Sequence, residues 1–165
     1  MRKNGYSLLE LIIVLILISL STALVTPSLS RFSKTIELKA AAKKVSGILR
    51  YCRSEAVNKG LIYQVIFNPE LREVKVQSID LDEEKKEGDK KEEVSKKTYS
   101  LPYGIEMKEV NLTSPQYPSD LPTVEFYPNG GSNGGSFLLN SQEQKGYKIK
   151  VDFLTGVVKV EKMKG

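Results

Sequence analysis

The sequence has no histidine and only one cysteine, Cys52, in its 165 residues. Histidine is the side chain that most often transfers protons in catalysis, so histidine-based catalysis is excluded. A single cysteine without histidine also leaves too few ligands for the usual zinc sites and excludes a disulfide within the chain. These absences argue against an enzyme, and we expect no catalytic residue, no metal site and no cofactor.

Positive and negative charges are also nearly balanced. The chain has 25 lysines and arginines against 20 acidic residues, a formal net charge of +5. So mild an excess does not by itself indicate a nucleic-acid partner. The length suits one membrane segment followed by one modest domain of about 100 to 130 residues.

The apolar residues gather in a long segment at the N-terminus. A basic head, residues 1–4, ends in Gly5, and an almost unbroken apolar run extends from Tyr6 to Val25. As a helix this run would measure about 30 Å, the thickness of the hydrocarbon core of a bilayer. One carboxylate, Glu10, interrupts the run. Because a charge inside such a segment is costly, we expect Glu10 to have a function.

Two general explanations of this segment leave residues unexplained. A secretory signal peptide would end at small residues such as those at 21–23, but its apolar part is usually shorter and carries no acid. A plain signal anchor would be oriented by Arg2 and Lys3, which the positive-inside rule keeps in the cytoplasm. Neither accounts for Gly5 directly before the apolar run or for Glu10 within it.

A resemblance to a known family accounts for both residues. Residues 3–10, Lys-Asn-Gly-Tyr-Ser-Leu-Leu-Glu, resemble the class III signal of type IV pilins and type II secretion pseudopilins. The resemblance implies that a prepilin peptidase cuts between Gly5 and Tyr6 and that Tyr6 becomes a methylated N-terminus. Glu10 then matches the family's glutamate, and Pro27 matches its helix-kinking proline. The departures are Tyr6 where phenylalanine is usual, and Asn4 where arginine or lysine is frequent.

The physical chemistry of Glu10 agrees with a role in filament assembly. A carboxylate in apolar surroundings needs an opposite charge nearby. Cleavage would create an α-amino group at Tyr6, which a neighbouring subunit could present to Glu10. Such a pair would fix the axial stagger of the subunits, as buried polar groups fix register elsewhere.

The segment after Pro27 predicts an amphipathic helix. Proline removes a backbone donor, so we expect a bend near residues 24–27. We predict one helix from about Tyr6 to Asn58, capped at Gly60. Its apolar residues recur at steps of three and four. They are Leu29, Phe32, Ile36, Ala41, Val45, Ile48, Leu49, Cys52 and Ala56. We expect Cys52 to be a packed core thiol and the basic residues, Arg50 and Arg53 included, to form a solvated face.

After Gly60 the pattern changes to β-strands. Residues 61–67 and 72–79 predict a hairpin, and further strands are expected at 99–102, 105–110, 124–127, 136–139, 147–152 and 157–160. The insert at about 80–97 is almost wholly charged and predicts an exposed, mobile loop. The glycine-rich residues 128–135 lack the ending of a phosphate-binding loop, so we interpret them as a flexible connector.

Two stretches narrow the resemblance to one group of the family. Residues 49–56, Leu-Arg-Tyr-Cys-Arg-Ser-Glu-Ala, and the Phe-Tyr-Pro-Asn-Gly run at 126–130 with the terminal hairpin are similar to the GspH/FimT group of minor pseudopilins and pilins. This implies a pilin-like α+β fold, in which a long N-terminal helix packs on an antiparallel β-sheet domain. The implied organisation is a leader at 1–5, a transmembrane half-helix at 6–27, an amphipathic half-helix at 28–60 and a β-rich head at 61–165.

The group implies a minor subunit of an envelope filament in a type II secretion system. Its expected partners are other pseudopilin or pilin subunits, the prepilin peptidase and an inner-membrane assembly platform. The expected location is the bacterial inner membrane, crossed once, with the N-terminus cytoplasmic and the head periplasmic.

Two alternatives stay open at this point. One is a FimT-like minor pilin of a type IV pilus that serves DNA uptake, whose members resemble one another in an arginine-bearing terminal hairpin. Here the hairpin has Gly156-Val157-Val158-Lys159 and no arginine, so binding of nucleic acid is not favoured, although nearby lysines permit weak binding. The other is a soluble enzyme or carrier released by signal peptidase, which would begin after Ala23.

Overall fold

The computed structural model describes residues 7–80, 96–117, 119–141 and 144–163, and within these it leaves the side chains at 23–33, 144 and 145 undescribed. The predicted cleavage site at Gly5 and Tyr6 and most of the charged insert lie outside the described residues. Contacts divide the chain into Met1–Ile36 and Glu37–Gly165, which are treated separately below.

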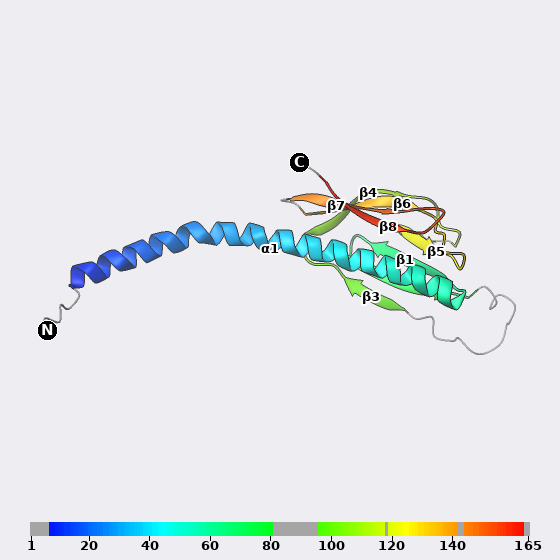
Figure 1. The fold of residues 1–165 in the computed structure, drawn as a ribbon, viewed down its shortest axis with the longest axis horizontal. Helices are drawn as coiled ribbons and strands as arrows, with labels where there is room; N and C mark the ends of the chain where they lie inside the picture. Colours follow the sequence, from blue (N-terminus) through cyan, green and yellow to red (C-terminus); the bar gives the residue numbers. More distant parts are fainter. Residues whose placement is uncertain (1–6, 81–95, 118, 142–143, 164–165) are drawn as a thin grey trace. The chain divides into compact units, whose positions relative to one another are not determined.

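One helix, α1, extends without interruption from Leu8 to Lys59 (Figure 1). It ends as predicted at Gly60, whose positive φ of 68° suits glycine and whose N–H donates to the carbonyl of Ala56 at 3.0 Å. The backbone stays helical through position 27, and the kink at Pro27 remains a prediction.

Among the described residues, eight strands form two antiparallel sheets after α1. The first sheet has the order β3-β2-β1-β5, and the second has the order β4-β6-β7-β8. The strands of the first are β1 Ile62–Asn68, β2 Glu73–Ile79, β3 Lys97–Ser100 and β5 Thr123–Phe126. Those of the second are β4 Ile105–Leu112, β6 Gly135–Ser141, β7 Gln144–Val151 and β8 Val158–Lys162. This is the predicted α+β architecture.

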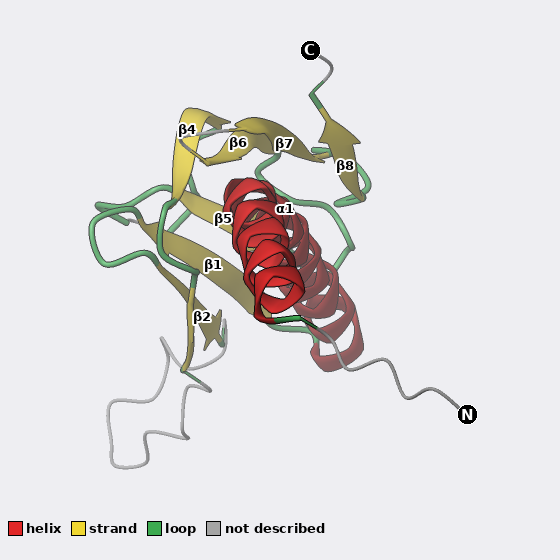
Figure 2. Cartoon of the chain, turned by 90° about the vertical axis from the view of Figure 1, so that its left-hand side faces the viewer, coloured by secondary structure: helices red, strands yellow, loops and turns green. Residues whose placement is uncertain are grey.

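The core lies between the two sheets and the C-terminal part of α1, and Figure 2 shows the sheets on different sides of that helix. Phe67 of β1 and Phe137 of β6 meet there with ring centroids 4.9 Å apart, which joins the sheets. The helix contributes the predicted stripe from Ala41 to Ala56, with Cys52 fully buried. Ile36 was wrongly included, since it is 52% exposed, and the buried residue at that end is Leu38.

The strands on either side of Gly104 belong to different sheets. β3 pairs with β2, whereas β4 pairs with β6, although only residues 101–104 separate them. The φ of Gly104 is 80°, which lets the chain turn sharply between the sheets. The two strands were recognisable in the sequence, but the exchange of sheets was not.

Candidate functional site

The start of α1 is built around Ser7 and Glu10. The Glu10 N–H donates to Ser7 Oγ at 3.3 Å, and the Leu11 N–H donates to the Ser7 carbonyl at 3.2 Å. Ser7 is therefore the N-cap, and Ser-Leu-Leu-Glu has the spacing of a capping box. The sequence contains this signal, which the assembly function predicted for Glu10 did not take into account.

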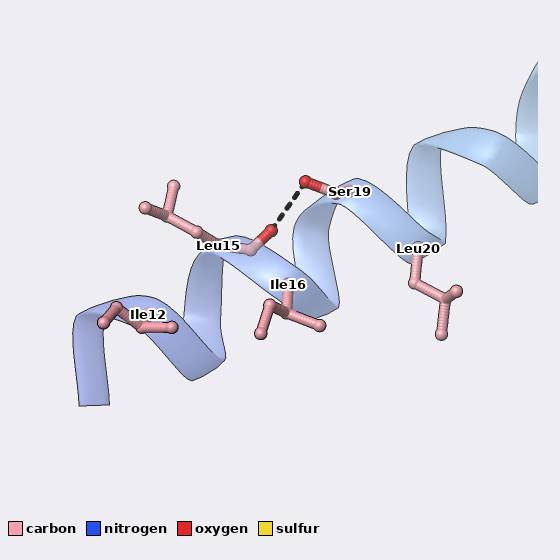
Figure 3. A pocket seen from close by; sticks show the side chains of 5 residues that line it. All are labelled: Ile12, Leu15, Ile16, Ser19 and Leu20. Carbon is pink, nitrogen blue, oxygen red and sulfur yellow. Dashed lines mark hydrogen bonds between the residues drawn. The ribbon is translucent and has the colours of Figure 1, made fainter. Parts of the chain in front are cut away.

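The apolar segment that follows is uncovered. Each large apolar side chain from Leu8 to Leu20 is between 46% and 79% exposed. Figure 3 shows Ile12, Leu15, Ile16 and Leu20 projecting from the helix. So continuous an apolar surface indicates a lipid or protein partner. Among the described residues, however, no helix combines the length and the apolar character that crossing a membrane requires.

The hydroxyl groups of this segment are satisfied within the helix. Ser19 Oγ donates to the carbonyl of Leu15 at 2.8 Å (Figure 3), and Ser21 Oγ donates to that of Leu17 at the same distance. The segment can therefore enter apolar surroundings without exposing these donors there. Glu10 differs, because the described residues provide no hydrogen-bond or ion-pair partner for its carboxylate.

The predicted site residues can be compared with the structure only in part. Gly5 and Tyr6 lie outside the described residues, and so does the side chain of Pro27. Glu10 is described and exposed on α1. Their proposed functions therefore stay predictions.

A second constellation joins α1 to the C-terminal part of the head. Arg53 Nε donates to the carbonyl of Thr155 at 2.7 Å and to that of Gly130 at 3.3 Å. One helical turn earlier, Arg50 Nη2 donates to the carbonyl of Val158 at 3.2 Å. Both arginines were predicted to lie on a solvated face. Arg50 is exposed as predicted, although it also binds the head, whereas Arg53 is half-buried, so the prediction was wrong for Arg53. The single Nε–H of Arg53 is shared between its two carbonyls, which come from segments distant in the sequence.

The glycine-rich connector is packed rather than loose. Residues 130–134 are all buried. A Cβ atom at Gly131 would lie 3.3 Å from the backbone oxygen of Phe153, and one at Gly134 would lie 3.0 Å from Phe153 Cβ. The lack of side chains thus allows the turn between β7 and β8 to lie directly on this loop. The connector was predicted correctly, but its flexibility was not, because glycine serves close packing here.

The side chain of Asn133 binds the same loop to β5. Its Oδ1 accepts the Glu125 N–H at 2.9 Å, and its Nδ2 donates to the carbonyls of Thr113 and Thr123 at 2.7 and 3.0 Å. A bridge between Phe126 and Ser132 continues the contact. The loop therefore satisfies the outer side of the β5 backbone, which would otherwise be an open sheet edge.

A buried carboxylate forms the third polar centre. Glu125 has no exposed surface, and its oxygens accept hydrogen bonds from Gln64 Nε2 at 2.8 Å and Tyr127 Oη at 3.0 Å. The N–H groups of Gln116 and Tyr117 donate to it at 2.6 and 3.0 Å, which fastens the loop before β5. Burial, and then the bond to Glu125, raise the pKa of Tyr127 to about 12. The strand predicted at 124–127 did not reveal this network.

The described residues offer no catalytic or metal-binding constellation. They contain no cluster of three or more histidine, cysteine or acidic side chains that could hold a metal ion. Burial raises the pKa of the Cys52 thiol to about 12, with a smaller contribution from Glu55, which keeps it protonated and unreactive at neutral pH. What the described residues provide is an exposed apolar helical segment and a head whose C-terminal hairpin is hydrogen-bonded to α1.

The chain was compared with known proteins, and no family model matches it. It is 25% identical over 158 residues to type II secretion system protein H of Xanthomonas campestris pv. campestris, which covers 96% of this chain and 83% of that protein. The chain is therefore similar to protein H along nearly its whole length. The alignment includes nearly the whole chain, so the relationship does not rest on the apolar segment alone.

Solved structures show the same fold. The minor pseudopilin EpsH from the type II secretion system of Vibrio cholerae superposes with a TM-score of 0.56 at 14% identity, over 76% of this chain and 97% of that one. The type IV minor pilin FimU of Pseudomonas aeruginosa superposes with a TM-score of 0.54 at 17% identity, over 79% of this chain and 92% of that one. The chain therefore has a pilin-like fold, shared with a minor pseudopilin and a type IV minor pilin.

Proposed function

We propose that the chain is a minor pseudopilin of a type II secretion system, a structural subunit rather than an enzyme. The similarity to protein H over 96% of the chain carries this proposal. The likeness to FimU concerns the fold, so it does not by itself favour a type IV pilus. The mechanism is mechanical, since assembly and disassembly of the filament would move cargo.

The N-terminal residues would prepare the subunit for assembly. A prepilin peptidase would cut between Gly5 and Tyr6 and leave a methylated α-amino group at Tyr6, directly before the Ser7 cap. A positive charge is unfavourable at the N-terminus of its own helix, where the backbone dipole is also positive. The Glu10 carboxylate of a neighbouring subunit would neutralise it, and the described residues give that carboxylate no other partner.

The remaining apolar surface would bind lipid before assembly and neighbouring helices afterwards. Residues 6–27 would anchor the subunit in the inner membrane, with the head on the periplasmic side. Other pseudopilins and an inner-membrane assembly platform would be its partners. The exposed side chains from Leu8 to Leu20 and the internally bonded hydroxyls of Ser19 and Ser21 suit both surroundings.

A gene deletion in the natural host tests this function. We expect loss of protein secretion, restored by the wild-type chain and not by Glu10→Leu. Loss of DNA uptake or of pili with secretion intact would instead favour the type IV minor pilin. A gel shift at low and physiological salt would separate these cases further, because binding to a DNA backbone weakens steeply with salt.

A further inference from the structure

The turn between β7 and β8 displays two large apolar side chains at its apex. Phe153 is 63% exposed and Leu154 is 80% exposed, although both lie in a head with a well-filled core. Single exposed apolar residues are common at protein surfaces, whereas two adjacent ones at the apex of one turn form a small apolar tip. We refer to residues 152–157 as the terminal turn.

The terminal turn is held in one conformation from several directions. Asp152 Oδ1 accepts hydrogen bonds from the Thr155 N–H at 3.0 Å and from its hydroxyl at 2.8 Å. The Gly156 N–H donates to the Asp152 carbonyl at 2.9 Å, and Arg53 holds the Thr155 carbonyl. A rigid apolar tip loses little conformational entropy when it binds, which makes it suitable as an anchor.

Positive charge lies directly behind this tip. Lys150 and Lys159 are opposite each other in the β7–β8 register, one residue pair before the buried pair Val151 and Val158. Because side chains alternate along a strand, both lysines lie on the outer face of the sheet, where both are exposed. Like charges in directly opposed positions destabilise a sheet, and an anionic ligand would relieve their repulsion. The hydrogen bonds from Thr155, and to a smaller extent the charge of Lys159, lower the pKa of Asp152, so this acid of the turn stays anionic and offsets part of the positive charge.

We propose that the terminal turn docks on an anionic lipid surface. Phe153 and Leu154 would enter the boundary between headgroups and acyl chains, and Lys150 and Lys159 would bind lipid phosphates. A convex apolar tip with cations behind it has the pattern of an interfacial membrane anchor. The inference rests on the proposed function for attachment of the chain to a bilayer, and it adds a second contact that would hold the head on the membrane before extraction into a filament.

The absence of tryptophan provides a direct test on the full chain. F153W introduces the sole tryptophan at the tip. Y103W is the matched control, because Tyr103 is an 87% exposed aromatic elsewhere on the head. Each variant is reconstituted into phosphatidylcholine vesicles with or without phosphatidylglycerol, and circular dichroism verifies folding.

In the anionic vesicles we expect the F153W emission to shift to shorter wavelength and to be quenched by brominated lipid, while Y103W does neither. Adding K150Q and K159Q to F153W should weaken docking about thirtyfold, since each lysine near such a surface contributes roughly fivefold. Flotation with the vesicles measures separately whether the N-terminal helix anchors the chain. A chain that does not float contradicts the proposed function, whereas a chain that floats without the F153W shift contradicts only the docking of the tip.

Two results would overturn the proposal. One is an F153W emission at the same long wavelength as that of Y103W, measured in anionic vesicles to which the chain is still bound. The other is a shift that grows with protein density but shows no quenching by brominated lipid, because this would assign the tip to a protein partner.

Discussion

Gly156 lies where the turn between β7 and β8 meets Arg53 of α1, and this contact depends on it most directly. Its φ is 61°, in the left-handed region. A Cβ atom there would lie 2.5 Å from the Gly130 carbonyl oxygen and 3.1 Å from Arg53 Cδ and Nε. Gly156→Ala therefore introduces backbone strain and a steric clash at the point where Arg53 binds two carbonyls.

The magnitude follows from these contributions. A non-glycine residue in the left-handed region costs about 1 kcal/mol. Overpacking against backbone and a guanidinium adds about 1–3 kcal/mol. Weakening the two Arg53 hydrogen bonds costs about 1 kcal/mol more. We expect Gly156→Ala to lower the free energy of unfolding by roughly 3–5 kcal/mol, a large part of the stability of a small domain.

Two other glycines serve as matched controls. Gly104 also has a positive φ, 80°, but nothing lies within 4 Å of the position of its Cβ, so Gly104→Ala measures strain alone, about 1 kcal/mol. Gly47 lies inside α1 with equally open surroundings, so Gly47→Ala should stabilise the chain by about 1 kcal/mol. Urea unfolding of the full chain in a mild detergent, followed by circular dichroism, gives all three values. If Gly156→Ala lowered the free energy of unfolding no more than Gly104→Ala does, the close packing around Gly156 would not stabilise the head as we propose.

Three further predictions concern single side chains. Glu10→Leu should leave the head folded but abolish co-purification with other pseudopilins, and normal incorporation would refute its role in assembly. The pKa of Tyr127 is raised to about 12 in the folded chain and is about 10 when unfolded. The free energy of unfolding should therefore decrease between pH 10 and 12, because the unfolded state loses the proton first. An equal decrease in a Tyr127→Phe variant would contradict this explanation. Cys52 should react with a thiol reagent only as fast as the head opens, and rapid labelling of the native chain at neutral pH would show that it is accessible.

The regular features of the fold were predictable because they depend on local patterns. The stripe through Ala41, Val45 and Cys52 repeats at helical spacing and is buried as expected. Gly60 ends the helix because its conformation suits few other residues. The β1–β2 hairpin follows from two apolar-patterned segments joined by a short turn.

Apart from the local cap at Ser7, the missed features depend on side-chain contacts that the strand and helix patterns do not encode. Arg53 and Thr155 are 102 residues apart, and nothing in the sequence near either residue reveals their hydrogen bond. Glu125 is a charged residue in a predicted strand, and its burial depends on four donors, of which Gln64 is distant in the sequence and the others come from the adjoining loop and strand. A glycine in a connector indicates flexibility or close packing equally well, and only the neighbouring backbone decides between them.

The central claim is that the chain is a pseudopilin matured at its N-terminus, and the mass and sequence of that terminus test it most directly. The chain would be purified from the membranes of its natural host and its first residues determined by mass spectrometry. The account predicts a mature chain that begins at N-methylated Tyr6. A chain that begins after Ala23, as signal peptidase would leave it, would contradict the account.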